Sequence, residues 1–254
     1  MRVIMSLVAL AALSLTALPA HATAFTPGEF VTWSEVEWGE DPTPTNISGV
    51  LESQFNSVFA PSYLLEVGIP GPTGYSMIFD SADAVIAYLP PGGAPAPLTA
   101  DLLDPITSAS GFLGGTVVAD TLNVTFSDAG LLAHPAGVTF GDLVFQHLEG
   151  LVSDPEFPGI GPEIAALDGI TVREALSDAD QVLGGATSPF TPMDLSQLLD
   201  LTIRAFNGGG VSNQADTYLA LPPSTAIPEP AVWAMLLIGF GALGIVRHRP
   251  TDAK

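Results

Sequence analysis

Few side chains in the central part of this chain have the type and spacing that catalysis requires. Between residues 23 and 220 the histidines are His134, which precedes a proline, and His147, which stands close to Glu149. The chain has no cysteine and contains neither a Gly-x-Ser-x-Gly nor a His-Glu-x-x-His motif. An isolated histidine is usually structural or exposed. We therefore assign no catalytic residue and no metal ligand from the sequence.

Acidic residues are numerous enough to supply the carboxylate pair of a glycoside hydrolase. Residues 30–38 are expected to form a strand, with Trp33, Glu35 and Glu37 on one face and Trp38 on the other. Aromatic and acidic side chains on one face invite a sugar-binding interpretation, but ordinary strand packing explains the pattern better. With 25 acidic residues in the body, carboxylate pairs also arise without catalytic meaning. A glycan-acting hydrolase is the alternative hypothesis.

Calcium is the one cation for which the acidic residues suggest a role. Asp178 and Asp180 lie in an expected helix, where residues two apart point about 200° from each other and do not share one ion. No EF-hand loop is present. Weak calcium binding at loop carboxylates such as Asp101 and Asp104 is left open, and no other cofactor is expected.

The charge balance excludes several classes of partner. The formal net charge is −21, and the basic residues between positions 23 and 220 are Arg173 and Arg204. Such a surface repels phosphate backbones, so nucleic acid is not an expected partner. Acidic polysaccharides are direct partners only if calcium bridges them. Without cysteine, the fold depends on a packed core and not on disulfides.

The N-terminus has the three parts of a secretory signal peptide. Arg2 supplies the positive charge, residues 3–18 form an apolar core, and Ala20 and Ala22 are the small residues of a cleavage site. The sequence predicts a signal peptide over residues 1–22, with cleavage after Ala22.

The C-terminus contains a second apolar segment. Residues 231–246 provide roughly 16 apolar positions, about 24 Å of helix, which is shorter than the bilayer core of about 30 Å. Arg247 and Arg249 follow it and orient the tail, residues 247–254, toward the cytoplasm. A proline-rich linker over residues 221–230 connects this predicted transmembrane helix to the body.

The same tail resembles the PEP-CTERM sorting signal, whose parts are a Pro-Glu-Pro motif, an apolar span and a basic end. The matching residues are Pro228, Glu229, Pro230, Ala231, Trp233, Gly239, Phe240, Gly241, Arg247 and Arg249. The resemblance implies recognition by exosortase, a membrane protease of Gram-negative bacteria, after export by the general secretion machinery and signal peptidase. It also implies a transient anchor in the inner membrane, followed by release to the cell surface or the extracellular space.

The body between these signals is expected to combine strands and helices. Strict alternation predicts a strand over residues 121–128, and residues 138–148 and 63–69 are further strand candidates. Ser81 is the expected N-cap of a short helix that ends at Pro90.

Two amphipathic helices are predicted in the last third of the body. The first begins with the capping box Thr171–Glu174 and ends at Gly184, and the second begins at Thr191 with Pro192 in its first turn. Asp200 and Arg204 in the second helix have the spacing of an ion pair. The two helices are expected to pack as a hairpin against the sheet.

These elements predict one extracytoplasmic α+β domain over residues 23–220. It has antiparallel strands and a helical part over about residues 168–218; a mainly-β sandwich with appended helices is the alternative. Segments of the body, among them residues 54–59 and 168–185, resemble exported bacterial surface proteins of unknown activity. The hypothesis is a non-catalytic protein of the cell surface or extracellular matrix, associated with exopolysaccharide or biofilm.

Overall fold

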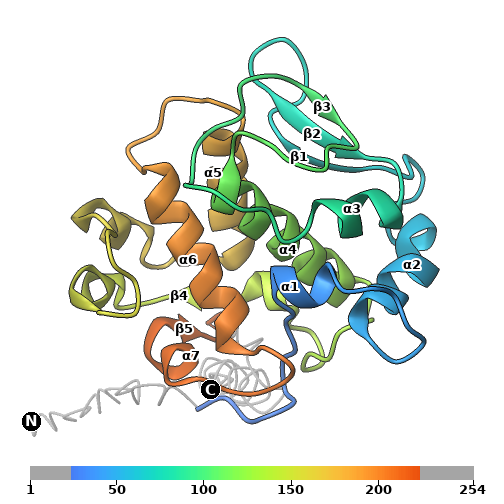
Figure 1. Cartoon of the computed structure of the whole chain (residues 1–254). Helices are drawn as coiled ribbons and strands as arrows, with labels where there is room; N and C mark the ends of the chain where they lie inside the picture. Colours follow the sequence, from blue (N-terminus) through green and yellow to red (C-terminus); the bar gives the residue numbers. More distant parts are fainter. Residues whose placement is uncertain (1–23, 224–254) are drawn as a thin grey trace, which may run out of the picture.

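The computed structural model describes residues 24–223, and helix α4 (Gly111–Asp128) runs through the middle of this body (Figure 1). Helices α5 (Val172–Leu183) and α6 (Pro192–Ala205) pack against α4 and against each other. The predicted signal peptide, the sorting motif and the predicted transmembrane segment lie outside the described residues.

The prediction of α5 and α6 is confirmed, including both ends of α5 and the start of α6. Thr171 and Glu174 form the expected capping box at the start of α5, and Gly184 is its C-cap. Thr191 caps α6, with Pro192 in the first turn. We expected these two helices to pack against a sheet. They pack mainly against α4 instead, although α5 also contacts β1.

The strand predicted over residues 121–128 is wrong, because these residues form the second half of α4. This helix is buried on nearly all sides, so its sequence lacks the polar stripe by which an amphipathic helix is recognised. The hydroxyl groups of Thr116, Thr121 and Thr125 donate to carbonyl groups of the preceding turn, which satisfies them inside the helix.

A small sheet covers one end of the helical core. Strand β1 (Leu65–Gly68) confirms the strand predicted over residues 63–69. It pairs antiparallel with β2 (Ser76–Phe79), whereas β3 (Leu102–Leu103) runs parallel to β2. Leu65 pairs with Phe79, and both side chains are buried on the core side of the sheet.

A second pair of strands lies at the opposite end of the molecule. Strand β4 (Val144–Phe145) pairs antiparallel with β5 (Leu219–Ala220). The strand region predicted over residues 138–148 is thus only partly strand, because the 3-10 helix η1 (Phe140–Asp142) precedes β4. Two further 3-10 helices follow, η2 (Leu148–Ser153) and η3 (Pro162–Leu167).

The N-terminal third is helical where a strand was expected. The strand predicted over residues 30–38 is wrong: Glu35–Trp38 form helix α1, because Ser34 and Glu37 make a capping box, and only Thr32 makes an isolated β-bridge. Helix α2 (Ile47–Val58), capped by Asn46, was not predicted. Helix α3 (Ala82–Tyr88) begins after Ser81, as predicted.

The last helix ties the C-terminal part to the beginning of the described chain. The amide of Phe25 donates to Oδ1 of Asp216 in α7 (Asn213–Tyr218), at 2.8 Å. The α+β class is confirmed, and the mainly-β alternative is wrong because helices form most of the core. None of the helices between residues 24 and 223 has the length and apolar character of a transmembrane span.

Candidate functional site

The residues assigned to sorting and processing lie outside the part of the chain that the structure describes. They are Ala20, Ala22, Pro228, Glu229, Pro230, Ala231, Trp233, Gly239, Phe240, Gly241, Arg247 and Arg249. Within residues 24–223, the histidines and the acidic residues are the candidates for chemistry.

The two histidines lie in separate loops, and their polar contacts are with a carbonyl group and a carboxylate. His134 is in a loop, where Nδ1 lies 2.9 Å from the carbonyl oxygen of Pro135. His147 has a left-handed backbone with φ of 57°, and its ring lies 3.9 Å from Glu149. The side chains of His147 and Glu149 are both more than half exposed. These contacts do not form a nucleophile–base pair.

The loop carboxylates considered for calcium are used to hold backbone amides. Asp101 accepts from the amide of Ser76, and Asp104 accepts from the amide of Asp80. Asp180 accepts from the amide of Gly68 at 2.7 Å, and burial raises its pKa to about 7. Within residues 24–223, no three His, Asp or Glu side chains are grouped so as to hold a metal ion.

Three acidic side chains of α1, α4 and α6, two of them buried and the third 13% exposed, lie close enough in the core for their charges to interact. They are Glu35 from α1, Asp120 from α4 and Asp200 from α6. Glu35 is 8% exposed and Asp120 is completely buried. Oε1 of Glu35, Oδ1 of Asp120 and Oδ2 of Asp200 are all buried without a hydrogen bond of good geometry, although Oδ2 of Asp200 forms an ion pair with Nη2 of Arg204 at 2.7 Å. We call Glu35, Asp120 and Asp200 the buried acid cluster.

Burial sets the protonation of this cluster. Desolvation raises the pKa of Glu35 to about 8, and the negative charges of Asp200 and Asp120 add to the shift. Desolvation also raises the pKa of Asp120 to about 8, against hydrogen bonding that lowers it. Both carboxyl groups therefore hold their protons at neutral pH. A protonated carboxyl group in a low-dielectric site has the properties of a general acid.

The hydrogen bond between α4 and α6 fits a protonated Asp120. Oγ1 of Thr202 lies 2.9 Å from Oδ2 of Asp120 and 2.7 Å from the carbonyl oxygen of Leu199. One hydroxyl proton does not serve both acceptors fully. If Asp120 is protonated, its own proton can complete the contact while Thr202 donates to Leu199.

Two glycines on α4 allow other elements to approach the buried acid cluster closely. A Cβ atom on Gly115 would lie 2.6 Å from Cδ of Pro91 and 2.9 Å from Oε1 of Glu35. A Cβ atom on Gly114 would meet the hydroxyl group of Tyr88, which also contacts Ser108 and Ser110. The glycines thus let α1 and the loop after α3 lie directly on α4.

Asn123 of α4 fixes the position of α1 above the cluster. Its Oδ1 accepts from the amide of Trp33 at 2.9 Å and from Nε1 of Trp38 at 3.3 Å. Its Nδ2 donates to the carbonyl group of Trp33. The aromatic and acidic residues that invited a sugar-binding interpretation are therefore partly core residues, with Trp38 fully buried.

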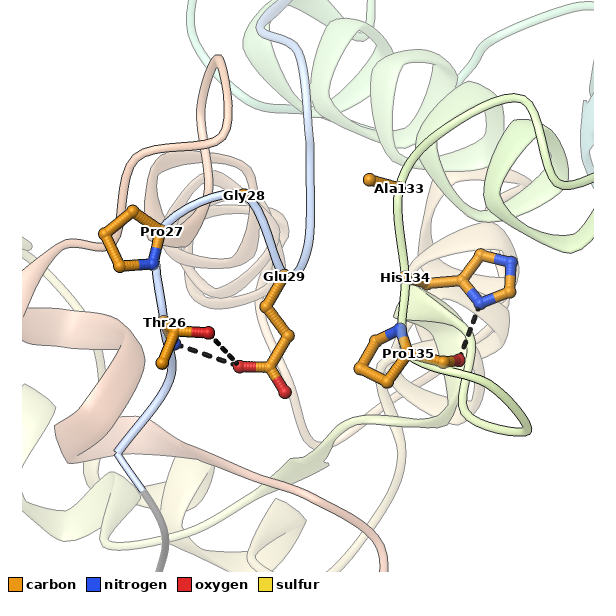
Figure 2. Close-up of a pocket in the computed structure, with 7 residues that line it drawn as sticks. All are labelled: Thr26, Pro27, Gly28, Glu29, Ala133, His134 and Pro135. Atoms are coloured by element: carbon orange, nitrogen blue, oxygen red, sulfur yellow. Dashed lines mark hydrogen bonds between the residues drawn. The ribbon is translucent and has the colours of Figure 1, made fainter.

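A surface hollow lies between the first described residues and the loop after α4 (Figure 2). It has a volume of about 470 Å³ and is lined by Thr26, Pro27, Gly28, Glu29, Ala133, His134 and Pro135. Oε2 of Glu29 accepts from both the amide and the hydroxyl group of Thr26. The hollow is wide open and does not reach the buried acid cluster, since none of its lining residues belongs to it.

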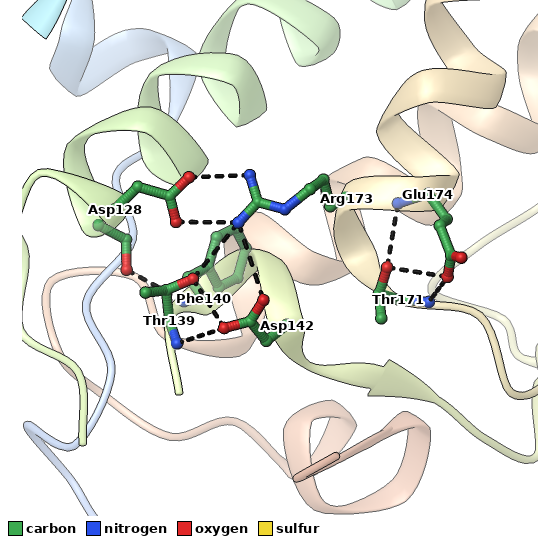
Figure 3. A network of polar contacts seen from close by, with 8 residues as sticks. Asp128, Thr139, Phe140, Asp142, Thr171, Arg173 and Glu174 are labelled. Atoms are coloured by element: carbon green, nitrogen blue, oxygen red, sulfur yellow. Dashed lines mark hydrogen bonds and ion pairs between the residues drawn. The ribbon is translucent and has the colours of Figure 1, made fainter. Parts of the chain in front are cut away.

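One polar network on the surface uses an arginine to connect three elements (Figure 3). Arg173 of α5 donates to both carboxylate oxygens of Asp128 at 2.8 and 2.9 Å, and its Nη2 lies 3.8 Å from Asp142 of η1. Asp128 keeps a lowered pKa, because the hydrogen bonds from Arg173 and Thr139 outweigh partial burial. The network joins the end of α4 to η1 and α5.

Sequence reasoning missed the buried acid cluster because its members are far apart in the chain. Glu35 was considered only as a surface residue of a strand, and Asp120 was not considered. The capping pattern Ser34-x-x-Glu37 was a local signal for α1. No local signal reveals that this helix docks on α4. Comparison of the chain with known protein families, with characterised proteins and with solved structures found no match.

Proposed function

We propose that this chain is an exported, exosortase-sorted protein of the cell surface or extracellular matrix, without catalytic activity and associated with exopolysaccharide. The observation that carries the proposal is the order of Pro228–Glu229–Pro230, an apolar run and two arginines at the C-terminus. The N-terminal signal pattern, with Ala20 and Ala22, complements it. The finer architecture is a secreted α+β body between a cleaved signal peptide and a transient transmembrane helix.

Two features of the folded body support this proposal. Phe25 is buried and its amide donates to Asp216, so a residue three positions after the predicted cleavage site belongs to the packed body. Residues 24–223 contain 25 acidic residues and two arginines, and both arginines are in ion pairs with aspartates. A strongly anionic surface keeps an exported protein soluble and limits adhesion to other anionic material.

Substitution of Glu229 tests the sorting step. We expect Glu229→Ala, in cells that contain an exosortase, to leave a longer form in the membrane fraction while the parent chain is shortened and released. The matched control is Glu52→Ala, which removes an exposed acid in α2 and should be processed like the parent. Processing and release of Glu229→Ala at the parent's rate would contradict the proposal.

A glycan-acting hydrolase is the second candidate, and the buried acid cluster is the observation that favours it. With a pKa of about 8, Glu35 would hold the proton that a general acid gives to a leaving group. Asp120 or Asp200 would be the second carboxylate. Turnover of any member of a glycan panel by the purified chain, abolished by Glu35→Gln, would establish this candidate. Turnover would equally overturn the non-catalytic proposal.

A further inference from the structure

One surface of this acidic body carries very little charge. It consists of residues 24–34, 129–138 and 207–223, which we call the charge-poor face. Of the 25 acidic residues between positions 24 and 223, this face contains only Glu29 and Asp216, and it contains no arginine. The remaining 23 acids belong to the other parts of the body.

The three segments of the charge-poor face lie side by side. The amide of Gly28 donates to the carbonyl group of Gly209 at 2.8 Å, and Thr32 pairs with residue 207 in a short parallel bridge. The hollow in Figure 2 joins residues 26–29 to residues 133–135. The face is therefore continuous, although 94 and 68 residues separate its successive segments in the chain.

The two acids of the face are both engaged in hydrogen bonds. Glu29 accepts from Thr26, and Asp216 accepts from the amide of Phe25. At one border, Arg173 forms ion pairs with Asp128 and Asp142 (Figure 3). Its positive charge partly cancels the negative charge of these two carboxylates.

The opposite border of the face is acidic. There Tyr218 of α7 donates to Asp154, and Gln214 donates to Glu156. A further border is acidic as well, because Oε1 of Glu37 accepts from Asn207 of the face. The low charge is therefore confined to the face itself.

Both ends of the described chain leave from this face. The chain enters at Ala24, next to the contact between Phe25 and Asp216. It leaves through Leu221, directly after α7 and β5. In Figure 1 these elements lie at the end of the molecule opposite the sheet β1–β2–β3.

We propose that the charge-poor face is the surface that the body presents to a lipid membrane while its terminal segments are still attached. This inference rests on the proposed function, which places an apolar segment at each end of the body. A body held at both ends on one side must turn that side to the bilayer. Anionic headgroups repel the faces that carry the other acids, and they repel the charge-poor face least.

The inference is tested with the full chain in vesicles of phosphatidylglycerol and phosphatidylethanolamine that contain a headgroup-quencher lipid. The chain has no cysteine, so single substitutions carry one fluorophore each. Ala133→Cys and Asn213→Cys, both exposed, label the charge-poor face. Thr73→Cys, in the exposed β1–β2 connection, labels the opposite end. Quenching at residues 133 and 213 should exceed that at residue 73 by at least about threefold, because a body of this size is about 40 Å across.

The outcomes separate the two proposals. A chain that does not co-sediment with vesicles overturns the sorting proposal, and this inference with it. A chain that co-sediments but is quenched equally at residues 73, 133 and 213 overturns this inference alone.

A substitution that adds charge provides a second test of the proposed orientation. With the label at residue 213, Ala133→Glu should lower the quenching on anionic vesicles and leave it unchanged on phosphatidylcholine vesicles. The matched control is Thr73→Glu, which adds the same charge at the far end. An equal loss from Thr73→Glu would contradict the proposed orientation.

Discussion

Asp120 and Thr202 connect α4 and α6 across the centre of the fold, with Oγ1 of Thr202 2.9 Å from Oδ2 of Asp120. Both residues are completely buried. The contact joins two helices whose other contacts are mainly apolar, so it specifies how they align. It also lies beside an unpartnered oxygen, Oδ1 of Asp120, so loss of the Thr202 hydroxyl group would weaken the hydrogen bonding of a carboxyl group that is already incompletely satisfied.

Thr202→Val should therefore destabilise the body more than an exposed threonine does. The substitution keeps the shape but leaves Asp120 without this partner, which costs about 1 to 3 kcal/mol. Urea unfolding followed by circular dichroism measures the free energy of unfolding. Thr217→Val, in the exposed part of α7, is the matched control and should cost much less. Equal losses from the two variants would show that the buried contact contributes nothing specific.

The buried acid cluster should make the fold more stable in acid than at neutral pH. The pKa values of Glu35 and Asp120 are raised from 4.5 and 3.8 to about 8, so the folded state binds their protons more tightly than the unfolded state. The stability linked to these groups is complete below pH about 4 and is lost as the pH rises toward about 8. Unfolding temperatures measured between pH 5 and pH 9 should fall steadily.

Variants of the two acids identify the source of this dependence. Glu35→Gln and Asp120→Asn cannot ionise, so each should flatten the pH profile and unfold at a higher temperature than the parent at pH 8. Glu52→Gln, at an exposed position, should leave the profile unchanged. A parent whose unfolding temperature rises between pH 5 and pH 8 would contradict the assignment.

The contrast between α5 and α4 shows which parts of the fold the sequence predicts. Helix α5 has one buried face, a capping box and a terminal glycine, so the pattern of the segment alone defines it. Helix α4 has apolar or small residues on nearly all sides, and its apolar residues at alternate positions, Leu122, Val124 and Phe126, imitate a strand. Its helical state depends on partners far away in the chain. For the same reason the buried acid cluster, which α4 brings together with α1 and α6, was not predicted.

Gly115→Ala should destabilise the body, although alanine is the better helix former. The change gains up to about 1 kcal/mol of helix propensity. A Cβ atom at this position would, however, lie 2.6 Å from Pro91 and 2.9 Å from Oε1 of Glu35. The overlap forces the loop after α3 or α1 away from α4, at a cost of about 1 to 3 kcal/mol. Gly92→Ala is the control, because no atom lies within 4 Å of its added methyl group. A gain in stability from Gly115→Ala would mean that the loop does not lie on α4.

Arg173→Gln should cost a modest amount of stability that depends on salt. Arg173 binds Asp128 through two hydrogen bonds, but its side chain is 45% exposed, so we expect a loss of about 1 kcal/mol. Arg173→Lys keeps the charge without the two parallel bonds and should lie between the parent and Arg173→Gln. Urea unfolding at low salt and in about 0.5 M NaCl should show the difference between the parent and Arg173→Gln shrinking as the charges are screened. A difference that stays constant with salt would indicate that the side chain acts through packing instead of charge.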